Sequence, residues 1–255
     1  MRLSELKNSI LSRRVSVGTW ISIGHPDVTE MLAHQGFDWL LFDLEHGPLT
    51  IESLQRLLQS MNGSPAAALV RTPPGQPSLA GRVLDCGADG VVFPMIDDRP
   101  QARAAVDACK YPPLGCRGMG PRRAAGYGRI ETDYLGSAND RTVVAIQIET
   151  GGAVERIDRI LSVPGIDAAL LGLGDLSASL GCHLDFAAPS VVEAVETVLA
   201  ACRRHGVLPG MAYAHDAATA RAYVEQGFRL VGVGSDDAFL MDGSRRALDG
   251  LGSLR

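Results

Sequence analysis

The sequence predicts a closed (β/α)8 TIM barrel that spans residues 1–255 as a single domain. Three observations support this fold class: the chain has 255 residues, eight short apolar segments recur along it, and helical segments separate them. Barrels of this type typically contain about 250 residues and have eight parallel strands. A doubly wound open sheet is the alternative, but no glycine-rich dinucleotide-binding pattern follows the first apolar segment.

The predicted strands are near-continuous apolar runs, as expected for strands that are buried on both faces of a parallel sheet. They comprise residues 15–21, 39–45, 67–72, 90–95, 143–149, 168–172, 207–212 and 230–234. A glycine ends the helical segment before several of them, as in AHQGFDWLLFD at 33–43 and VEQGFRLVGVG at 224–234. Glycine suits this position because it adopts a positive φ without a Cβ clash.

Helix starts are marked by capping residues. Asp27 and Glu30 fit a capping box for the first helix, and Pro26 precedes them. Asp216 is expected to cap a later helix, and Asp236 or Asp237 is expected to cap the last one.

One connection, at about residues 111–140, is rich in Pro, Gly and Arg and is predicted to be a long irregular loop. Connections this long in a compact domain usually serve function or assembly. Its arginines are Arg117, Arg122, Arg123 and Arg129. They could receive an anionic second substrate, but we favour a solvated or subunit-contact role.

The composition argues against several classes of function. A net charge of −5 disfavours nucleic acid and anionic membranes as partners. No apolar run reaches the ~18 residues of a membrane span, and the first residues lack the apolar core of a signal peptide. The five cysteines form no CxxC pair, so we expect reduced thiols in a cytoplasmic protein and no cysteine-bound zinc.

Polar side chains follow four of the predicted strands. In such barrels the active site lies at the carboxyl ends of the strands. The residues found there are Asp43, Glu45 and His46; Arg71; Gln147 and Glu149; and Gly174 with Asp175. Because these residues share one rim of the barrel, the sequence predicts a single polar site.

Glu149 and Asp175 are the best candidates for metal ligands. Two carboxylates that leave other positions to water and substrate suit Mg²⁺, Mn²⁺ or Co²⁺ better than a closed zinc site. The alternative is that each carboxylate caps the helix that follows its strand.

His46 and Arg71 are the candidates for proton transfer and anion stabilisation. Histidine ionises near neutral pH, and acidic neighbours could orient His46 as a general base. A planar guanidinium at Arg71 suits a carboxylate or a developing enolate. The alternatives are a purely structural histidine and an ion pair of Arg71 with Asp43, Glu45 or Asp85.

Seven segments, in order along most of the chain, resemble the HpcH/HpaI family of class II pyruvate aldolases. This family includes 4-hydroxy-2-oxoheptanedioate and 2-dehydro-3-deoxyglucarate aldolases. The segments are GTW at 18–20, GFDWLLFDLEHGP at 36–48, VRTP at 70–73, LDCGADGVVFP at 84–94, KYPPLGCRG at 110–118, QIET at 147–150 and GLGDLSASLG at 172–181.

The resemblance implies a role for each candidate on the base side of the site. His46 would be the general base, acting through a water molecule held by the metal, with Asp43 and Asp85 tuning it. Arg71 would stabilise the enolate or carbonyl oxygen. The fold implied is the phosphoenolpyruvate/pyruvate type of TIM barrel.

The resemblance also assigns the binding residues. Glu149 and Asp175 would hold the divalent metal cation, while Gln147 and the backbone at Gly174 and Asp175 would bind the keto acid. Gly174 departs from relatives, which often carry Ala in a GPxD loop where this chain reads GLGD. A homohexamer, or trimer of dimers, with exchanged C-terminal helices is implied as well.

These roles predict reversible aldol cleavage of a 4-hydroxy-2-oxo acid to pyruvate, or a related 2-keto acid, and an aldehyde through an enolate. A Schiff-base route needs a lysine in the pocket, and neither Lys7 nor Lys110, the only lysines, follows a predicted strand. The alternatives are an enolate formed by oxaloacetate decarboxylation, a citrate-synthase-like condensation, and a non-catalytic keto-acid-binding barrel.

Overall fold

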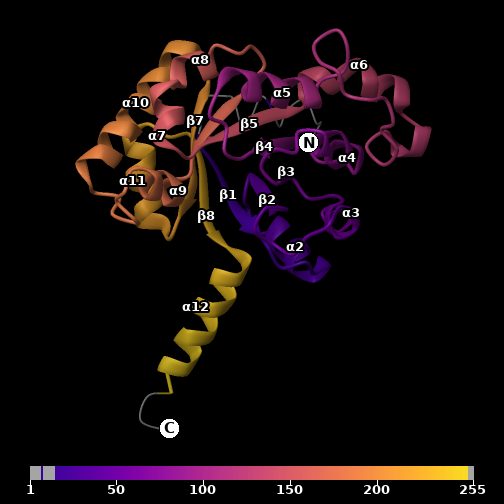
Figure 1. The fold of residues 1–255 in the computed structure, drawn as a ribbon. Helices are drawn as coiled ribbons and strands as arrows, with labels where there is room; N and C mark the ends of the chain where they lie inside the picture. The colour runs from indigo at the N-terminus through magenta and orange to yellow at the C-terminus, as the bar shows by residue number, and fades with distance from the viewer. Residues whose placement is uncertain (1–6, 8–14, 252–255) are drawn as a thin grey trace.

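Eight parallel strands close into a barrel in the computed structural model, which describes residue 7 and residues 15–251 (Figure 1). Each strand pairs with the next in the chain, and β8 pairs with β1. The strands are β1 Ser16–Ile21, β2 Trp39–Asp43, β3 Ala67–Arg71, β4 Gly90–Phe93, β5 Val143–Ile148, β6 Ala168–Leu171, β7 Leu208–Ala214 and β8 Leu230–Ser235. The predicted (β/α)8 fold class is therefore confirmed.

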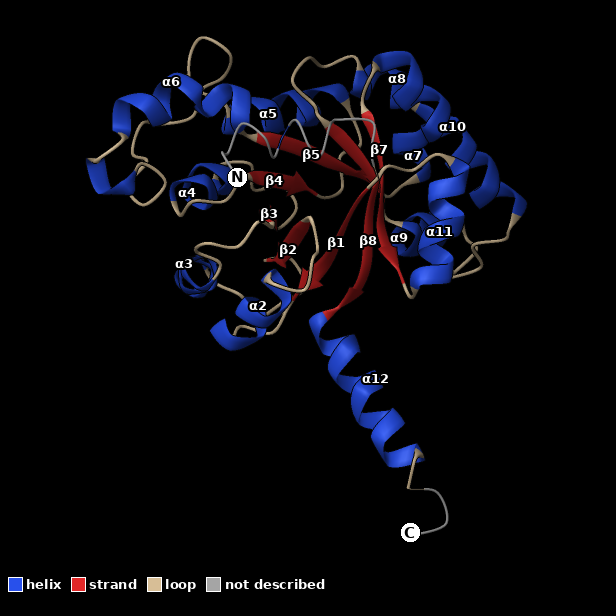
Figure 2. Cartoon of the chain, turned by 180° about the vertical axis from the view of Figure 1, so that it is seen from behind, coloured by secondary structure: helices blue, strands red, loops and turns tan. Residues whose placement is uncertain are grey.

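Helices surround the barrel, except that α12 projects away from it (Figures 1 and 2). They are α2 Pro26–Ala33, α3 Ile51–Ser60, α4 Leu79–Asp85, α5 Arg99–Cys109, the 3-10 turn η1 Gly126–Gly128, α6 Glu131–Arg141, α7 Gly151–Glu155, α8 Ile157–Leu161, α9 Leu173–Ser179, α10 Pro189–His205, α11 Ala217–Gln226 and α12 Asp236–Asp249. Within the described residues, no helix has the length and apolar character that crossing a membrane requires.

The prediction of an irregular loop across residues 111–140 was wrong in its last third, where α6 lies. This helix was missed because it buries only Tyr134 and Ala138, too few apolar residues for a helical period.

The capping predictions had mixed outcomes. Asp216 caps α11 as expected, accepting the N–H of Thr219 at 2.8 Å. For α2 the prediction was wrong: His25 is the N-cap, and its Nδ1 accepts the N–H of Asp27 at 3.3 Å. Asp236 and Asp237 lie inside α12 rather than at its N-cap.

The interior of the barrel is filled by side chains that alternate along the strands. Trp39, Leu41 and Leu69 belong to this inner cluster. Gly18 makes room for it, because a Cβ there would lie 2.0 Å from Trp39 Cδ2. The same alternation turns Asp43 at the end of β2, Arg71 at the end of β3 and Gln147 near the end of β5 toward the mouth of the barrel.

Three aspartates latch neighbouring strands at the amino end of the barrel. Asp38, Asp89 and Asp167 stand before β2, β4 and β6. Their carboxylates accept the N–H groups of Val17, Ala68 and Val144, near the starts of β1, β3 and β5, at 2.8, 2.9 and 2.9 Å. In return, the backbone N–H of each aspartate donates to the carbonyl of the residue that its carboxylate binds, Val17, Ala68 or Val144, at 2.8 Å.

The fourth pair, β7 and β8, lacks this latch. Arg229 stands where the aspartate would be, and its N–H donates to the carbonyl of Pro209 at 2.9 Å. Because Pro209 has no N–H, a carboxylate at position 229 would find no backbone N–H there from which to accept a hydrogen bond.

Replacing Asp167 with Ala is expected to lower the free energy of unfolding by about 1–3 kcal/mol, because the N–H of Val144 loses its acceptor. Asp167 is only 11% exposed and also pairs with Lys7 at 3.0 Å. Urea denaturation measures the loss. Asp38→Ala is the matched comparison and should cost less, because Asp38 is exposed and water can replace its carboxylate. Equal losses would contradict this account.

Candidate active site

Four strands deliver buried polar or aromatic side chains to the mouth of the barrel. They are Trp20 from β1, Asp43 from β2, Arg71 from β3, and Gln147 with Glu149 from the end of β5. All five are buried. The structure therefore brings together four of the residues that the sequence predicted for the site, with Trp20 added to them.

Arg71 is held rigidly by acids and by an aromatic ring. Its Nε and Nη2 donate to the two carboxylate oxygens of Asp43 at 3.0 and 2.7 Å. Its Nε lies 3.1 Å from Glu45 Oε2, and its guanidinium lies 4.3 Å from the ring centre of Trp20. The ion pair that was the alternative role of Arg71 is thus present. Asp43 uses two of the five guanidinium N–H groups, so donors remain for a ligand.

Asp43 stays charged despite its burial. Burial alone would raise its pKa, but the hydrogen bonds and charge of Arg71, with the backbone N–H groups of Glu45 and His46, lower it below the ordinary value. Asp43 therefore fixes both the guanidinium and the turn that carries His46.

Glu149 is a buried carboxylate that accepts two hydrogen bonds. Gln147 Nε2 donates to its Oε1 at 2.9 Å, and the N–H of Met95 donates to its Oε2 at 2.9 Å. Met95 has a φ of 53°, the left-handed region, which turns its N–H toward Glu149 just after β4. A Cβ at Gly172 would lie 2.4 Å from Glu149 Oε1, so only glycine fits beside this carboxylate.

The surroundings of Glu149 favour its protonated form. Burial raises its pKa to about 7, the N–H of Met95 and the charge of Arg71 oppose this, and the negative charges of Glu45 and Asp175 add to it. Burial likewise raises the pKa of Glu45. Buried acids that repel one another are characteristic of functional sites.

Glu149 should make folding pH-dependent. Its pKa is 4.5 ordinarily and about 7 in the fold. Its contribution to stability is therefore complete below pH 4.5 and is lost as the pH rises toward 7, by about 3 kcal/mol at most. Denaturation of metal-free protein at pH 5 and 7.5 tests this. The Glu149→Gln variant should lose less stability across that interval, and an identical loss in both proteins would contradict the prediction.

The oxygen atoms beside Glu149 fit a hard cation. Gln147 Oε1 is buried and accepts no hydrogen bond from the part of the chain that the structure describes, and Asp175 lies close enough for its charge to raise the pKa of Glu149. Among the described residues, no group of three or more His, Cys, Asp or Glu side chains is arranged around a common point. A cation there would thus rely on Glu149, Asp175 and oxygen atoms of other origin.

The alternative that these acids cap helices was wrong for both. Thr150 caps α7, with its Oγ1 accepting the N–H of Ala153 at 3.0 Å. Gly172 is the N-cap of α9 and has no side chain to offer. Asp175 and Gly174 lie in the first turn of α9 and are exposed.

His46 lies at the open side of the site. Its side chain is 66% exposed, and its Nε2 is 4.0 Å from Glu45 Oε1. A hollow of about 650 Å³ adjoins it, lined also by Trp20, Asp43 and Ser235. The imidazole is therefore accessible to a molecule that enters from solvent.

Asp85 does not approach His46 within the chain. It ends α4, which runs opposite to the strands, so it lies near the amino end of β4 and a strand length, about 13 Å, from the opposite rim. Its Oδ1 accepts Arg117 Nη2 at 2.6 Å. The expectation that Asp85 tunes His46 is not met within the chain, because the chain order places the two at opposite ends of the barrel.

Neither lysine reaches the site. Lys7 pairs with Asp167, and Lys110 Nζ donates to the carbonyls of Asn139 and Thr142 at 2.6 and 2.9 Å. Burial lowers the pKa of Lys110 to about 8, but the residue lies at the amino end of the barrel, after α5.

Two contributors to the site were not singled out from the sequence. One is Trp20, whose Nε1 donates to the carbonyl of Ala212 at 2.7 Å and whose ring faces Arg71. Its place at the end of a predicted strand was an available signal. The N–H of Met95 was not predictable, because a backbone donor leaves no mark in residue type.

The chain is similar to known proteins over most of its length. Residues 16–242 match the profile of the HpcH/HpaI aldolase/citrate lyase family. A 2-keto-3-deoxy-L-rhamnonate aldolase of Klebsiella pneumoniae is 39% identical over 232 residues, covering 90% of this chain and 86% of that protein. A hydroxypyruvate/pyruvate aldolase of Roseovarius nubinhibens is 36% identical over 244 residues, or 95% and 94% of the two chains.

Solved structures agree with these relatives. An HpcH/HpaI aldolase/citrate lyase family protein from Burkholderia cenocepacia superimposes with a TM-score of 0.92 at 36% identity, covering 97% of this chain and 99% of the other. The citrate synthase SbnG superimposes with a TM-score of 0.86 at 25% identity, covering 96% of each chain.

Proposed function

Because this chain belongs to the HpcH/HpaI aldolase/citrate lyase family, we propose that it is a divalent-metal-dependent class II aldolase. It would cleave a 4-hydroxy-2-oxo acid to pyruvate, or a related 2-keto acid, and an aldehyde. The observation that carries the proposal is the fixed cation Arg71, held between Asp43 and Trp20 at the same mouth as Glu149 and Gln147.

The chain supplies groups for each proton and charge in this reaction. His46 would take the proton of the 4-hydroxyl, the C3–C4 bond would break to release the aldehyde, and its electron pair would form the enolate. The free N–H groups of Arg71 would donate to the C2 oxygen as it gains negative charge, which is typically worth ~3–4 kcal/mol for one such donor. Return of this proton from His46 to C3 would then yield the 2-keto acid.

Binding of the keto acid would rest on Gln147 and on the backbone N–H groups of Gly174 and Asp175 in the first turn of α9. Glu149 and Asp175 would hold the cation, as Mg²⁺, Mn²⁺ or Co²⁺. When bound, the cation would add positive charge beside the keto-acid oxygens and so favour enolate formation.

The test is a screen for retro-aldol cleavage. C6–C7 hydroxy-keto-diacids and sugar-derived hydroxy-keto acids are incubated with the Mn²⁺-loaded protein, and released pyruvate is measured with lactate dehydrogenase. Cleavage of at least one class supports the proposal. No cleavage, together with no exchange of pyruvate methyl protons, would contradict the proposal.

A second candidate is a synthase that adds a pyruvate-type enolate to another electrophile or forms it from oxaloacetate. The structural likeness to the citrate synthase SbnG supports it. Release of CO₂ from oxaloacetate without any retro-aldol activity would favour this candidate over the aldolase.

An oligomer would reconcile Asp85 with His46. Helix α12 projects from the barrel with exposed apolar side chains, among them Leu240, Met241 and Leu248, which supports the exchange of C-terminal helices in a homohexamer. In such an assembly Asp85 could serve His46 only across a subunit boundary.

Mixed oligomers test this arrangement. The His46→Ala and Asp85→Asn variants should each lose most of their activity, while co-expression should restore about one quarter of the wild-type activity per site, as random pairing of subunits predicts. Activity is measured as pyruvate release from the best substrate of the screen. Full activity of Asp85→Asn alone, or no recovery on mixing, would contradict a role across the boundary.

A further inference from the structure

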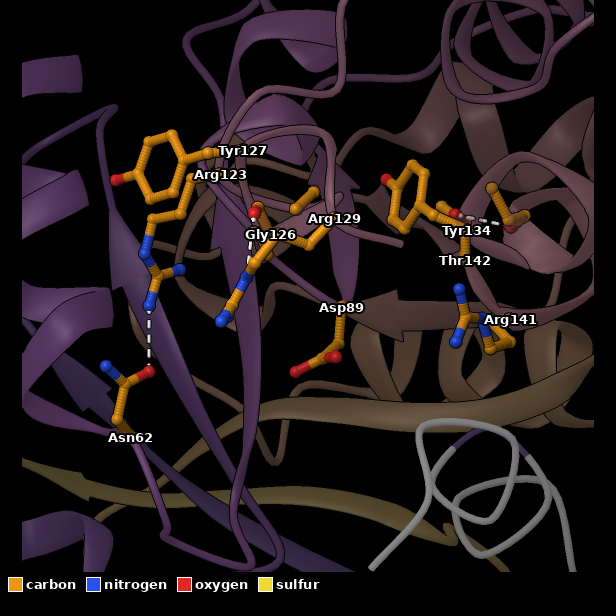
Figure 3. Close-up of a pocket in the computed structure, with 13 residues that line it drawn as sticks. Asn62, Asp89, Arg123, Gly126, Tyr127, Arg129, Tyr134, Arg141 and Thr142 are labelled. Carbon is orange, nitrogen blue, oxygen red and sulfur yellow. Dashed lines mark hydrogen bonds between the residues drawn. The ribbon is translucent and has the colours of Figure 1, made fainter. Parts of the chain in front are cut away.

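A second cavity, of about 350 Å³, lies at the amino end of the barrel, opposite to the candidate active site. The end of α3, the start of β4, the segment around η1 and helix α6 enclose it (Figure 3). Its polar lining consists mainly of Asn62, Asp89, Arg123, Arg129, Tyr134 and Arg141. None of these residues takes part in the proposed aldol reaction.

The cavity has three guanidinium groups in its wall. Arg123 is fixed by neutral oxygens: its Nη1 donates to the carbonyl of Cys86 at 2.7 Å, and its Nη2 donates to Asn62 Oδ1 at 3.0 Å. Arg129 donates from its Nε to the carbonyl of Gly126 at 3.3 Å (Figure 3). Among the described residues, its two terminal nitrogens have no hydrogen-bond acceptor, so they remain available to a ligand. Arg141 lies against the ring of Tyr134, 5.5 Å from its centre.

Negative charge in the cavity does not balance these cations. Within residues 15–251, no carboxylate lies within 4.0 Å of the guanidinium groups of Arg123, Arg129 or Arg141. Asp89 is the acid of the lining, and its Oδ2 already accepts the N–H of Ala68 at 2.9 Å. Burial raises the pKa of Asp89 to about 6, so even at neutral pH it offers one negative charge against three positive ones.

We propose that this cavity binds an anion that carries phosphate or carboxylate groups, at a site separate from that of the keto acid. Planar guanidinium groups bind both kinds of oxyanion through paired N–H donors. The volume of about 350 Å³ suits a small metabolite, and the overall net charge of −5 disfavours nucleic acid as the occupant. A phosphate ester and a polycarboxylate share this chemistry, and the experiment separates them.

Thermal unfolding of the full chain in EDTA, at constant ionic strength, tests the proposal with three probes: inorganic phosphate, pyrophosphate and citrate. Near saturation, binding should raise the Tm of the wild-type protein by about 2–4 °C. The Arg129→Ala/Arg141→Ala variant should lose this rise. Arg122→Ala is the matched control, because it removes one arginine of the same segment outside the cavity, and it should keep the rise.

Two further variants protect the test against loss of folding. Arg129→Ala alone removes an exposed side chain and should weaken binding without lowering the Tm of the anion-free protein. Asp89→Asn keeps an oxygen for the N–H of Ala68 but removes the competing charge, so it should tighten binding about fivefold. A larger effect of pyrophosphate than of citrate assigns the site to phosphate groups, and the reverse assigns it to carboxylates. The proposal is overturned by equal Tm rises in the wild-type and double-variant proteins, or by none with all three anions.

Discussion

Removing divalent cations with EDTA should abolish the exchange of pyruvate methyl protons with deuterium in D₂O, and Mn²⁺ or Mg²⁺ should restore it. Without a cation, the acids Glu149, Asp175 and Glu45 offer no positive charge at the place where the keto acid would become an enolate, and Arg71 is already paired with Asp43. Proton NMR of the pyruvate methyl signal measures the exchange rate.

A matched variant separates loss of the cation from loss of the fold. Glu149→Gln should keep the hydrogen bond from Met95 through its remaining oxygen but bind the cation weakly, so more Mn²⁺ should be needed for half-maximal exchange. Undiminished exchange in EDTA by the wild-type protein would remove the metal from the proposed reaction. A variant with unchanged Mn²⁺ demand would remove Glu149 from the ligand set.

Replacing His46 with Ala should lower the same exchange rate by about 10²–10⁴-fold, the usual contribution of a general base. Pyruvate binding should persist, because the exposed imidazole does not support Arg71, Gln147 or Glu149. Exchange is followed by NMR, and binding of pyruvate to the Mn²⁺-loaded variant is followed by calorimetry.

His34→Ala is the control for this prediction. His34 is also exposed, but it follows α2 at the amino end of the barrel, so its loss should change exchange less than twofold. If His46→Ala exchanged protons at the wild-type rate, another group would have to be the base. If it failed to bind pyruvate, His46 would instead be a binding residue.

The barrel and much of its mouth were predictable because both follow from local patterns. Continuous apolar runs identify buried parallel strands, and the alternation along a strand determines which side chains face inward. Arg71, Gln147 and Glu149 were found in this way, and the structure buries all three where β3 and β5 end.

Features that depend on long-range geometry were not predictable. The N–H of Met95 reaches Glu149 through a left-handed residue, which nothing in the side chain of methionine announces. Asp85 was assigned to His46 by resemblance, whereas the structure places it at the end of α4, near the opposite end of the same barrel. Helix α6 was missed because a short amphipathic helix with two buried residues resembles a polar loop.

The missing latch between β7 and β8 gives the barrel a seam. Three strand pairs are closed at their amino ends by an aspartate, whereas Pro209 and Arg229 leave the fourth with a backbone contact alone. The register of β8 also shifts against both of its neighbours. The amino-end pairing of β7 and β8 should therefore open more readily than that of the three latched pairs, whereas Arg71 and Glu149 lie at the opposite, carboxyl end of the barrel.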